Sequence, residues 1–308
     1  MKFTITYLMH SHPYHPEFAS GTGVATLAAA CEKAGFDGFG FTDHPAPTQR
    51  WLDAGGHDSL DPFVAMGFAA AHTSTLRLIP NIVVLPYRNP FVVAKAGATV
   101  DRLSDGRFTL AVGVGYLRKE FAAVGVDYDE RAELFDEALG VIDAIWTGDD
   151  VTLTGKHFAA NGITAHPRPV GTPRPPIWIG GNTGAARQRV VDRAEGWCPF
   201  AAPKALAQTA KTAALDSVEA LGVAIEDLRR RCDAAGRDAG ALDIAFTNFE
   251  GGSPGADDFD AAAHLEGLEA LARLGVTWVH VHLPGDSVAH ALEAIDRFRV
   301  EVIDVMDR

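Results

Sequence analysis

Short apolar, β-branched stretches alternate along the chain with longer stretches in which apolar residues recur at helical spacing. Strands are predicted near residues 3–8, 38–42, 76–86, 107–115, 177–181, 196–200, 242–249 and 276–283. Helices are predicted near residues 23–34, 61–72, 89–106, 129–146, 182–194, 204–235 (in at least two pieces), 261–274 and 287–305. Strands that alternate with helical patterns indicate βαβ units and a parallel sheet.

The number of these units predicts the fold class. Eight strand–helix units in a chain of 308 residues fit an α/β fold of the (β/α)8 TIM-barrel type better than a doubly wound sheet. Residues from about 147 to 176 read as an inserted excursion, a small hairpin followed by a Pro-rich connector. We therefore expect one domain over residues 1–308.

Composition narrows the class of protein. Hydrophobic residues make up 47% of the chain, which is ample for a core, and the formal charge is −13, which argues against a nucleic-acid partner. Three cysteines in no metal-like spacing read as free thiols. We find no secretory leader and no apolar run of membrane-spanning length, so we expect a cytoplasmic protein that binds neither membrane nor nucleic acid.

Candidate chemistry lies just after the predicted strands, because barrels of this kind place their active sites at the carboxyl ends of the strands. Asp43 and His44 follow the second strand, and a carboxylate near an imidazole can orient the ring and raise its pKa. A solvent-exposed turn before Pro45 is the simpler interpretation. Glycines at 180, 181 and 184 precede a helix and favour an anion site, with a plain tight turn as the alternative.

Histidines at other strand ends raise a rival hypothesis. His10 and His12 after the first strand have the spacing of metal-dependent amidohydrolase barrels. Those enzymes need further histidines after later strands, and the ends of the fifth and sixth strands carry none, so we expect no metal site. On the last strand, His280 fits a packed core beside Trp278, whereas His282 is nearer the strand end and could line a pocket.

Two stretches resemble a known family. Residues 76–121, which include LPYRNPFVVAKAGATVDRLSDGRFTLAVGVGYLRKEF, and residues 175–197, PPIWIGGNTGAARQRVVDRAEGW, are similar to the bacterial luciferase-like monooxygenase superfamily. Within this superfamily, the two stretches are most similar to the coenzyme F420-dependent oxidoreductases. The resemblance is weak over residues 204–240 and moderate again at GVTWVHVHLP.

The resemblance implies a luciferase-like TIM barrel that holds a deazaflavin or flavin at its mouth, meaning the carboxyl ends of the strands. A bulge with a non-prolyl cis peptide at Asn81–Ile82 would back the ring. Asp43 and His44 would contact the cofactor and the reacting substrate. The remaining residues that the resemblance implies for the cofactor are Val114, Gly115 and Tyr116 after the fourth strand, and Gly180, Gly181, Asn182, Thr183, Gly184 and Ala185 for its phosphate.

The resemblance also suggests a reaction and its alternatives. We expect hydride transfer between F420 and an organic substrate, with His44 as proton donor or acceptor and Asp43 and Tyr116 beside it. Tyr116 stands where sugar-phosphate dehydrogenases of the family carry a catalytic glutamate, which argues against a sugar phosphate. An FMN-dependent monooxygenase that uses O2 is the first alternative, and a non-catalytic flavin-binding barrel is the second.

The sequence does not determine the substrate or whether the protein forms a homodimer. The segment 45–61, with Trp51 and His57, and the excursion 147–176 would shape the substrate pocket. Apolar residues of the helices near 61–72 and 89–106 could contact a second copy in a homodimer or simply cover the barrel. Phe63, Phe68 and Phe91 are the candidates.

Overall fold

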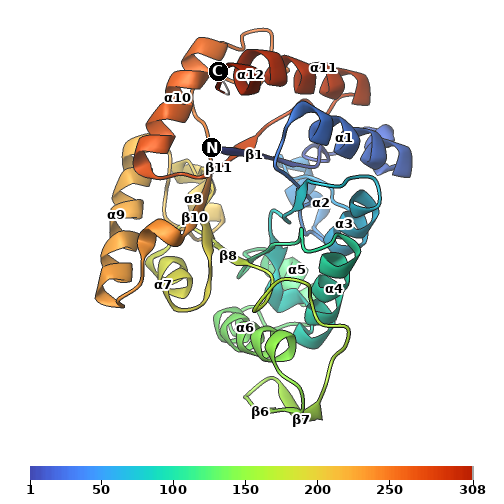
Figure 1. The fold of residues 1–308 in the computed structure, drawn as a ribbon, viewed down its shortest axis with the longest axis vertical. Coiled ribbons are helices and arrows are strands. Elements are labelled where there is room, and N and C mark those ends of the chain that lie inside the picture. The colour runs from blue at the N-terminus through green and yellow to red at the C-terminus, as the bar shows by residue number, and fades with distance from the viewer. Residues whose placement is uncertain (307–308) are drawn as a thin grey trace.

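A parallel sheet lies at the centre of the computed structural model, which describes residues 1–306 (Figure 1). Nine strands form it in the order β3-β2-β1-β11-β10-β9-β8-β5-β4, and all their pairings are parallel. Its strands are β1 (Lys2–Thr6), β2 (Gly38–Gly40), β3 (Arg77–Leu78), β4 (Val83–Val84), β5 (Leu110–Gly113), β8 (Ile177–Gly180), β9 (Gly196–Cys198), β10 (Asp243–Thr247) and β11 (Trp278–Val281).

Helices cover the outside of this sheet (Figure 1). The longer ones are α1 (Gly21–Ala34), α3 (Pro62–Ala70), α4 (Pro90–Leu103), α6 (Arg131–Thr147), α7 (Gly184–Arg193), α9 (Val218–Ala234), α10 (Ala261–Leu274) and α11 (Val288–Phe298). Asp61 and Asn89 cap α3 and α4, each followed by a proline that suits the first helical position. Four short helices were not predicted separately: α2 (Gln49–Asp53), α5 (Arg118–Ala123), α8 (Lys204–Thr209) and α12 (Asp304–Met306).

The sheet is curled, because its two edge strands, β3 and β4, follow one another in the chain. A bridge between Leu78 and Phe108 joins the β3 edge to the segment that leads into β5. Successive residues of β5 face opposite sides of the curled sheet. Leu110 and Val112 pack with the helices on the outside, whereas Ala111 belongs to a separate group of side chains in the interior. That interior group consists of Ile79, Ala111, Trp178, Cys198, Ala245 and Trp278.

The third predicted strand, residues 76–86, is interrupted. Residues 79–82 lie between β3 and β4, and the Asn81–Ile82 peptide among them is cis. The N–H groups of Ile79 and Asn81 still donate to the carbonyls of Phe39 and Phe41. Gly40 makes room for this bulge, because a Cβ there would lie 1.6 Å from the carbonyl oxygen of Ile79. Ile82 points between Gly113 and Gly180, where added Cβ atoms would lie 2.3 and 2.4 Å from its Cδ1. Periodicity missed the interruption because Ile79, Pro80 and Ile82 continue the apolar run, with Asn81 as the one polar residue between β3 and β4.

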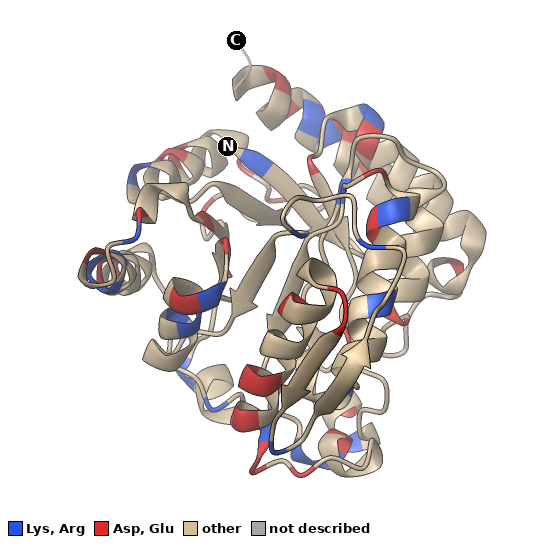
Figure 2. Ribbon diagram, turned by 60° about the horizontal axis from the view of Figure 1, so that its bottom comes forward, with Lys and Arg blue, Asp and Glu red and all other residues tan. Residues whose placement is uncertain are grey.

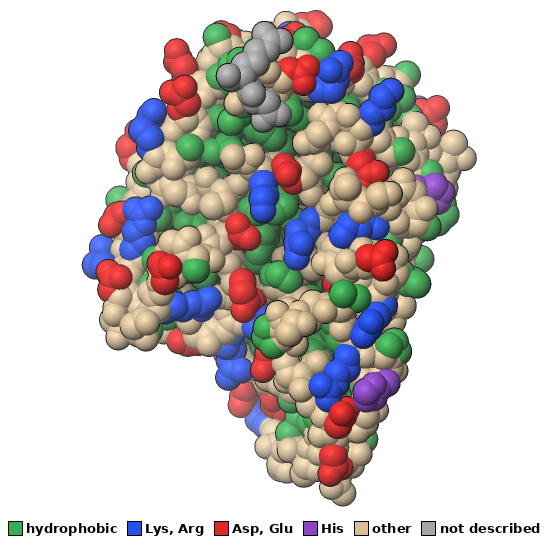
Figure 3. Space-filling view, in the orientation of Figure 1, with side chains coloured by type: hydrophobic (Ala, Val, Ile, Leu, Met, Phe, Trp, Pro, Cys, Tyr) green, Lys and Arg blue, Asp and Glu red, His purple; other side chains and the backbone are tan. Residues whose placement is uncertain are grey.

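The predicted excursion contains the expected hairpin. β6 (Val151–Thr154) and β7 (Ala159–Ile163) pair antiparallel as a sheet of their own. The hairpin extends beyond α6 at the far end of the molecule, and the space-filling surface narrows toward it (Figures 1 and 3). Residues 164–176 then return to β8 without regular structure.

Charge and apolar surface are distributed as expected for a sheet enclosed by helices. Figure 2 shows Lys, Arg, Asp and Glu mainly on helices and connecting segments, with the strands almost free of charge. Phe63 is buried, Phe68 on the same helix is 42% exposed, and Phe91 on α4 is partly buried. Contact of these residues with a second copy stays a prediction. Among residues 1–306, none of the helices has the length and apolar content that a membrane crossing requires.

Candidate functional site

His44 lies just beyond β2 at the mouth, and both its backbone and its ring are held. Its backbone N–H donates to Ser59 Oγ at 3.0 Å, and the Ser59 hydroxyl donates back to the His44 carbonyl at 3.2 Å. Its ring Nδ1 lies 3.1 Å from Glu120 Oε2. The imidazole therefore has one fixed nitrogen, and Nε2 on the opposite side of the ring is the atom left for chemistry.

Glu120, on α5, is a buried carboxylate with three hydrogen-bond donors. Besides His44, it accepts from the Ala46 N–H at 2.9 Å and from the Tyr87 hydroxyl at 3.0 Å. Burial tends to raise the pKa of Glu120, but these hydrogen bonds outweigh it and hold the pKa below its ordinary value. Burial and the Glu120 charge raise the pKa of Tyr87, which keeps that hydroxyl protonated as a donor.

The prediction that Asp43 is the carboxylate beside the His44 ring is wrong. Successive residues of an extended segment point to opposite sides, so Asp43 faces away from the imidazole. It is buried, accepts from the Val84 N–H at 3.0 Å, and pairs with Arg88 at 2.7 Å. Asp43 thus links the segment after β2 to β4. Its contact with a cofactor stays a prediction.

We expect Asp43→Asn to lower the free energy of unfolding by about 3 kcal/mol, because it leaves Arg88 with an incomplete ion pair. Urea denaturation followed by far-ultraviolet circular dichroism measures this change. Asp129→Asn is the matched control, since the Asp129–Arg118 pair is exposed and little change is expected there. Equal stability of the Asp43 variant and the wild type would contradict the anchoring role.

Aromatic side chains surround the His44 ring. Trp51 on α2 lies 4.6 Å from it between ring centroids, His57 lies 4.9 Å away and Tyr116 lies 6.5 Å away. Burial first, and the Glu120 charge second, raise the pKa of Tyr116, so its hydroxyl is a hydrogen-bond donor rather than a base. The predicted pair of Tyr116 and His44 is thus brought together, along with both named residues of the segment 45–61.

Two further histidines reach the mouth from the first and last strands. His10 follows β1, and a Cβ on Gly285 would lie 3.0 Å from its Nε2, so it packs against the segment after β11. His282 lies just after β11, 3.3 Å from the Thr247 hydroxyl. Burial and His282 lower the pKa of His10, and burial lowers that of His282. His280 is deeper, and burial lowers its pKa to about 4, as expected for the core residue predicted.

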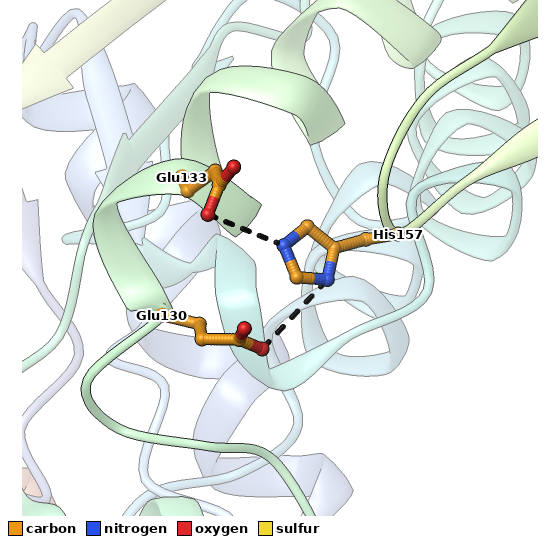
Figure 4. A group of neighbouring side chains, drawn as sticks. All are labelled: Glu130, Glu133 and His157. Carbon is orange, nitrogen blue, oxygen red and sulfur yellow. Dashed lines mark ion pairs between the residues drawn. The ribbon is translucent and has the colours of Figure 1, made fainter.

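The histidines at the mouth do not form a metal site. Among residues 1–306, the group with ligand atoms close enough for a metal is Glu130, Glu133 and His157, near the start of α6 (Figure 4). Lys156 lies 3.0 Å from Glu130 and 2.7 Å from Glu133, so an ammonium group already pairs with both carboxylates. His12, which the amidohydrolase hypothesis requires as a ligand, is instead 2.8 Å from Asp58.

The residues after β3 and β5 place the predicted bulge at the mouth. The Asn81 amide donates to the Thr6 hydroxyl at 2.8 Å, which ties the bulge to β1. Val114 and Gly115 follow β5, and Gly115 has a φ of +80°, where an added Cβ would lie 2.5 Å from Val84 Cγ1. Asn81 and Ile82 thus lie in the bulge before β4, and Val114 and Gly115 follow the adjoining strand β5. Their contact with a cofactor stays a prediction.

The glycine turn after β8 leads into α7. Gly181 has a φ of +102°, and Thr183 caps the helix by accepting from the Ala186 N–H. The first-turn amides of Gly184 and Ala185 have no acceptor within their helix, which suits an anion. The side chain of Asn182 is already hydrogen-bonded within the protein: it donates to the carbonyls of Phe200 and Ala213 and accepts from the Phe200 N–H.

Sequence reasoning missed several residues that build this turn and the His44 site. Arg187, in the first turn of α7, donates to the Asn182 carbonyl at 2.9 Å. Arg231, from α9, would lie 3.3 Å from a Cβ on Gly184. Glu120 lies 76 residues from His44 in the chain. The one available signal was a glutamate one helical turn after Tyr116, which is weak evidence by itself.

Two surface pockets lie elsewhere. One, of about 430 Å³, is lined by Arg174 and Ile177, and another, of about 220 Å³, is lined by Leu242, Ile244 and Thr277. These residues precede or begin β8, β10 and β11, so both pockets are at the amino ends of the strands. Active sites on barrel-like sheets lie at the opposite end, and we assign no function to either pocket.

Comparison with known proteins identifies the family. The family model described as luciferase-like monooxygenase matches residues 1–249. The chain belongs to this family. It is also similar in fold to the monooxygenase RslO1 from Streptomyces bottropensis, with a TM-score of 0.81, 19% identity, and coverage of 99% of this chain and 100% of that one.

Relatives of this luciferase-like chain use two kinds of cofactor. The F420-dependent glucose-6-phosphate dehydrogenase of Nakamurella multipartita is 31% identical over 212 residues, 67% of this chain and 60% of that protein. The FMNH(2)-dependent dimethylsulfone monooxygenase of Pseudomonas putida is 30% identical over 175 residues, 56% of this chain and 46% of that protein. In both cases the match spans less than two thirds of the relative's own length.

The residues at the mouth fit a flavin-type group. The bulge presents backbone at the strand ends, and Gly40, Gly113 and Gly180 lack the Cβ atoms that would obstruct it. The α7 amino terminus offers unpaired amides to an anionic tail, with two arginines nearby. The family therefore supports an oxidoreductase or monooxygenase with F420 or FMN, and the choice between the two cofactors belongs to the proposal below.

Proposed function

We propose that the protein is an oxidoreductase that transfers a hydride between coenzyme F420 and an organic substrate bound at the mouth. The observation that carries the proposal is His44, held by the buried carboxylate of Glu120 beside the bulge at Asn81–Ile82. A bound deazaflavin supplies the hydride chemistry, whereas the protein supplies position and a proton. The F420-dependent relative supports this choice of cofactor.

The role of His44 follows from its hydrogen bonds. Glu120 is ionised and can only accept, so His44 Nδ1 carries a proton toward it and Nε2 is the atom that takes or gives a proton. Ser59 holds the His44 backbone, and Trp51 packs against the ring. A general acid or base held in this way contributes about 10²- to 10⁴-fold to a reaction.

The alternative is an FMN-dependent monooxygenase that uses O2. The FMNH(2)-dependent relative favours it, and the same bulge and glycine turn would serve either cofactor.

The proposal also includes an eight-stranded barrel, in which β3 and β4 are one strand interrupted by the bulge. The bridge between Leu78 and Phe108 supports that closure.

Titration of the apoprotein with F420 and with FMN, followed by tryptophan fluorescence, tests the cofactor. Trp51 is the natural reporter, since the other four tryptophans are at most 2% exposed. We expect F420 to bind at least about tenfold more tightly than FMN. Trp51→Phe, which removes the reporter but not the proposed cofactor contacts, should lose most of the quenching. Tighter binding of FMN would favour the alternative, and binding of neither would contradict both.

A further inference from the structure

The charge of the mouth depends on the side chains that reach it from different strands. We define the histidine cluster as His10, His44, His57 and His282, which come from the segments after β1, β2 and β11. His44 and His57 are in ring contact, and His10 packs against the segment that follows His282. The strands β2, β1 and β11 adjoin one another in the sheet, whereas the glycine turn follows β8, which is separated from them by β10 and β9.

Fixed charges around this cluster are already paired. Glu120 is bound by three donors, and Asp58 is 2.8 Å from His12. The nearest guanidinium on the His44 side, Arg88, is shared between Asp43 and Asp61. An anionic substrate would therefore find no free cation among the neighbours described for these histidines.

Burial favours the neutral form of three of these rings, because it lowers the pKa of His10, His57 and His282. Burial first, and the His44 charge second, lower the pKa of His57, while burial and His282 lower that of His10. Apart from Asp58, the charged groups that act on these two rings are other imidazoles. A neutral imidazole offers one donor and one acceptor, which suits hydroxyl and carbonyl groups.

We infer that the substrate part of the mouth binds an uncharged organic molecule that carries a hydroxyl or carbonyl group, through hydrogen bonds from the histidine cluster and packing on Trp51. The inference deepens the proposed function and rests on it, because it names the substrate class of the same site. It excludes phosphorylated and carboxylated compounds, since an unpaired anion there would lose its hydration without gaining a counter-charge. It concerns binding and adds no step to the reaction.

The first test needs no cofactor. Iodide, an anion, and acrylamide, a neutral molecule, both quench accessible tryptophan, and Trp51 lies 5.4 Å from His57. We expect His57→Lys to raise the iodide quenching constant at least about twofold over His57→Gln, with acrylamide quenching unchanged, because a cation attracts iodide. Wild type should match His57→Gln. A wild-type iodide constant equal to that of His57→Lys would show a mouth that is already positive and would overturn the inference.

The second test uses the cofactor-loaded protein and two ketones of matched shape, cyclohexanone and 4-oxocyclohexanecarboxylate. Perturbation of the cofactor absorbance measures their binding. We expect the neutral ketone to bind at least about tenfold more tightly, and His57→Lys to abolish that preference. Equal or tighter binding of the carboxylate, or binding of neither ketone at up to about 100 mM, would overturn the inference.

The two tests separate this inference from the proposed function. If neither F420 nor FMN binds, the proposed function fails, and the inference about its substrate fails with it. If a cofactor binds and the carboxylate is preferred, only the inference about the substrate fails. The iodide measurement reports the charge of the mouth in either case.

Discussion

His44→Ala is expected to lower turnover about 10²-fold or more while cofactor affinity changes by only several-fold. The imidazole is held by a buried carboxylate and surrounded by rings that can flank a substrate. Its removal eliminates the proton donor or acceptor. The anion-binding amides of α7 remain, so most of the cofactor affinity should persist.

Steady-state kinetics and fluorescence titration of the same preparation separate these two effects. Glu120→Gln is the informative companion variant, because an amide of the same shape keeps contact with His44 but loses the charge that fixes its tautomer. We expect its turnover to fall by about tenfold, less than for His44→Ala. Unchanged turnover in His44→Ala would remove His44 from the mechanism, whatever the companion variant does.

Gly40→Ala is expected to lower the free energy of unfolding by more than about 4 kcal/mol. The added Cβ would lie 1.6 Å from the Ile79 carbonyl oxygen and 2.7 Å from its carbon. Those atoms belong to backbone at the start of the bulge, so neither can move away as the end of a flexible side chain could. The strand or the bulge must shift.

Guanidinium denaturation measures this loss, and the soluble yield provides a second readout. Gly67→Ala is the matched control, since Gly67 lies in α3 and a Cβ there meets nothing within 4 Å. Alanine in an exposed helix is expected to be neutral or to stabilise by up to about 1 kcal/mol. A Gly40→Ala protein within 1 kcal/mol of wild type, by the same denaturation, would contradict the close approach of the bulge to β2.

The spacing of apolar residues predicted most of the helices and strands, because this spacing indicates which face of a helix or strand is buried. The helix over 261–274 was predicted with its observed bounds, and the parallel sheet followed from alternation. The interruption at Asn81–Ile82 could not be read from spacing. It depends on Gly40 and Gly113 on the neighbouring strands, which leave the space that the bulge fills.

The sequence by itself determined the alternation of strands and helices, the glycine turn before α7 and the presence of His44 at a strand end. Only the tertiary structure decided that Glu120, rather than Asp43, holds that imidazole, and that His10 packs against the segment following His282. The reason is geometric. Spacing along the chain fixes which side a residue faces, whereas the curling of the sheet fixes which distant residues meet there.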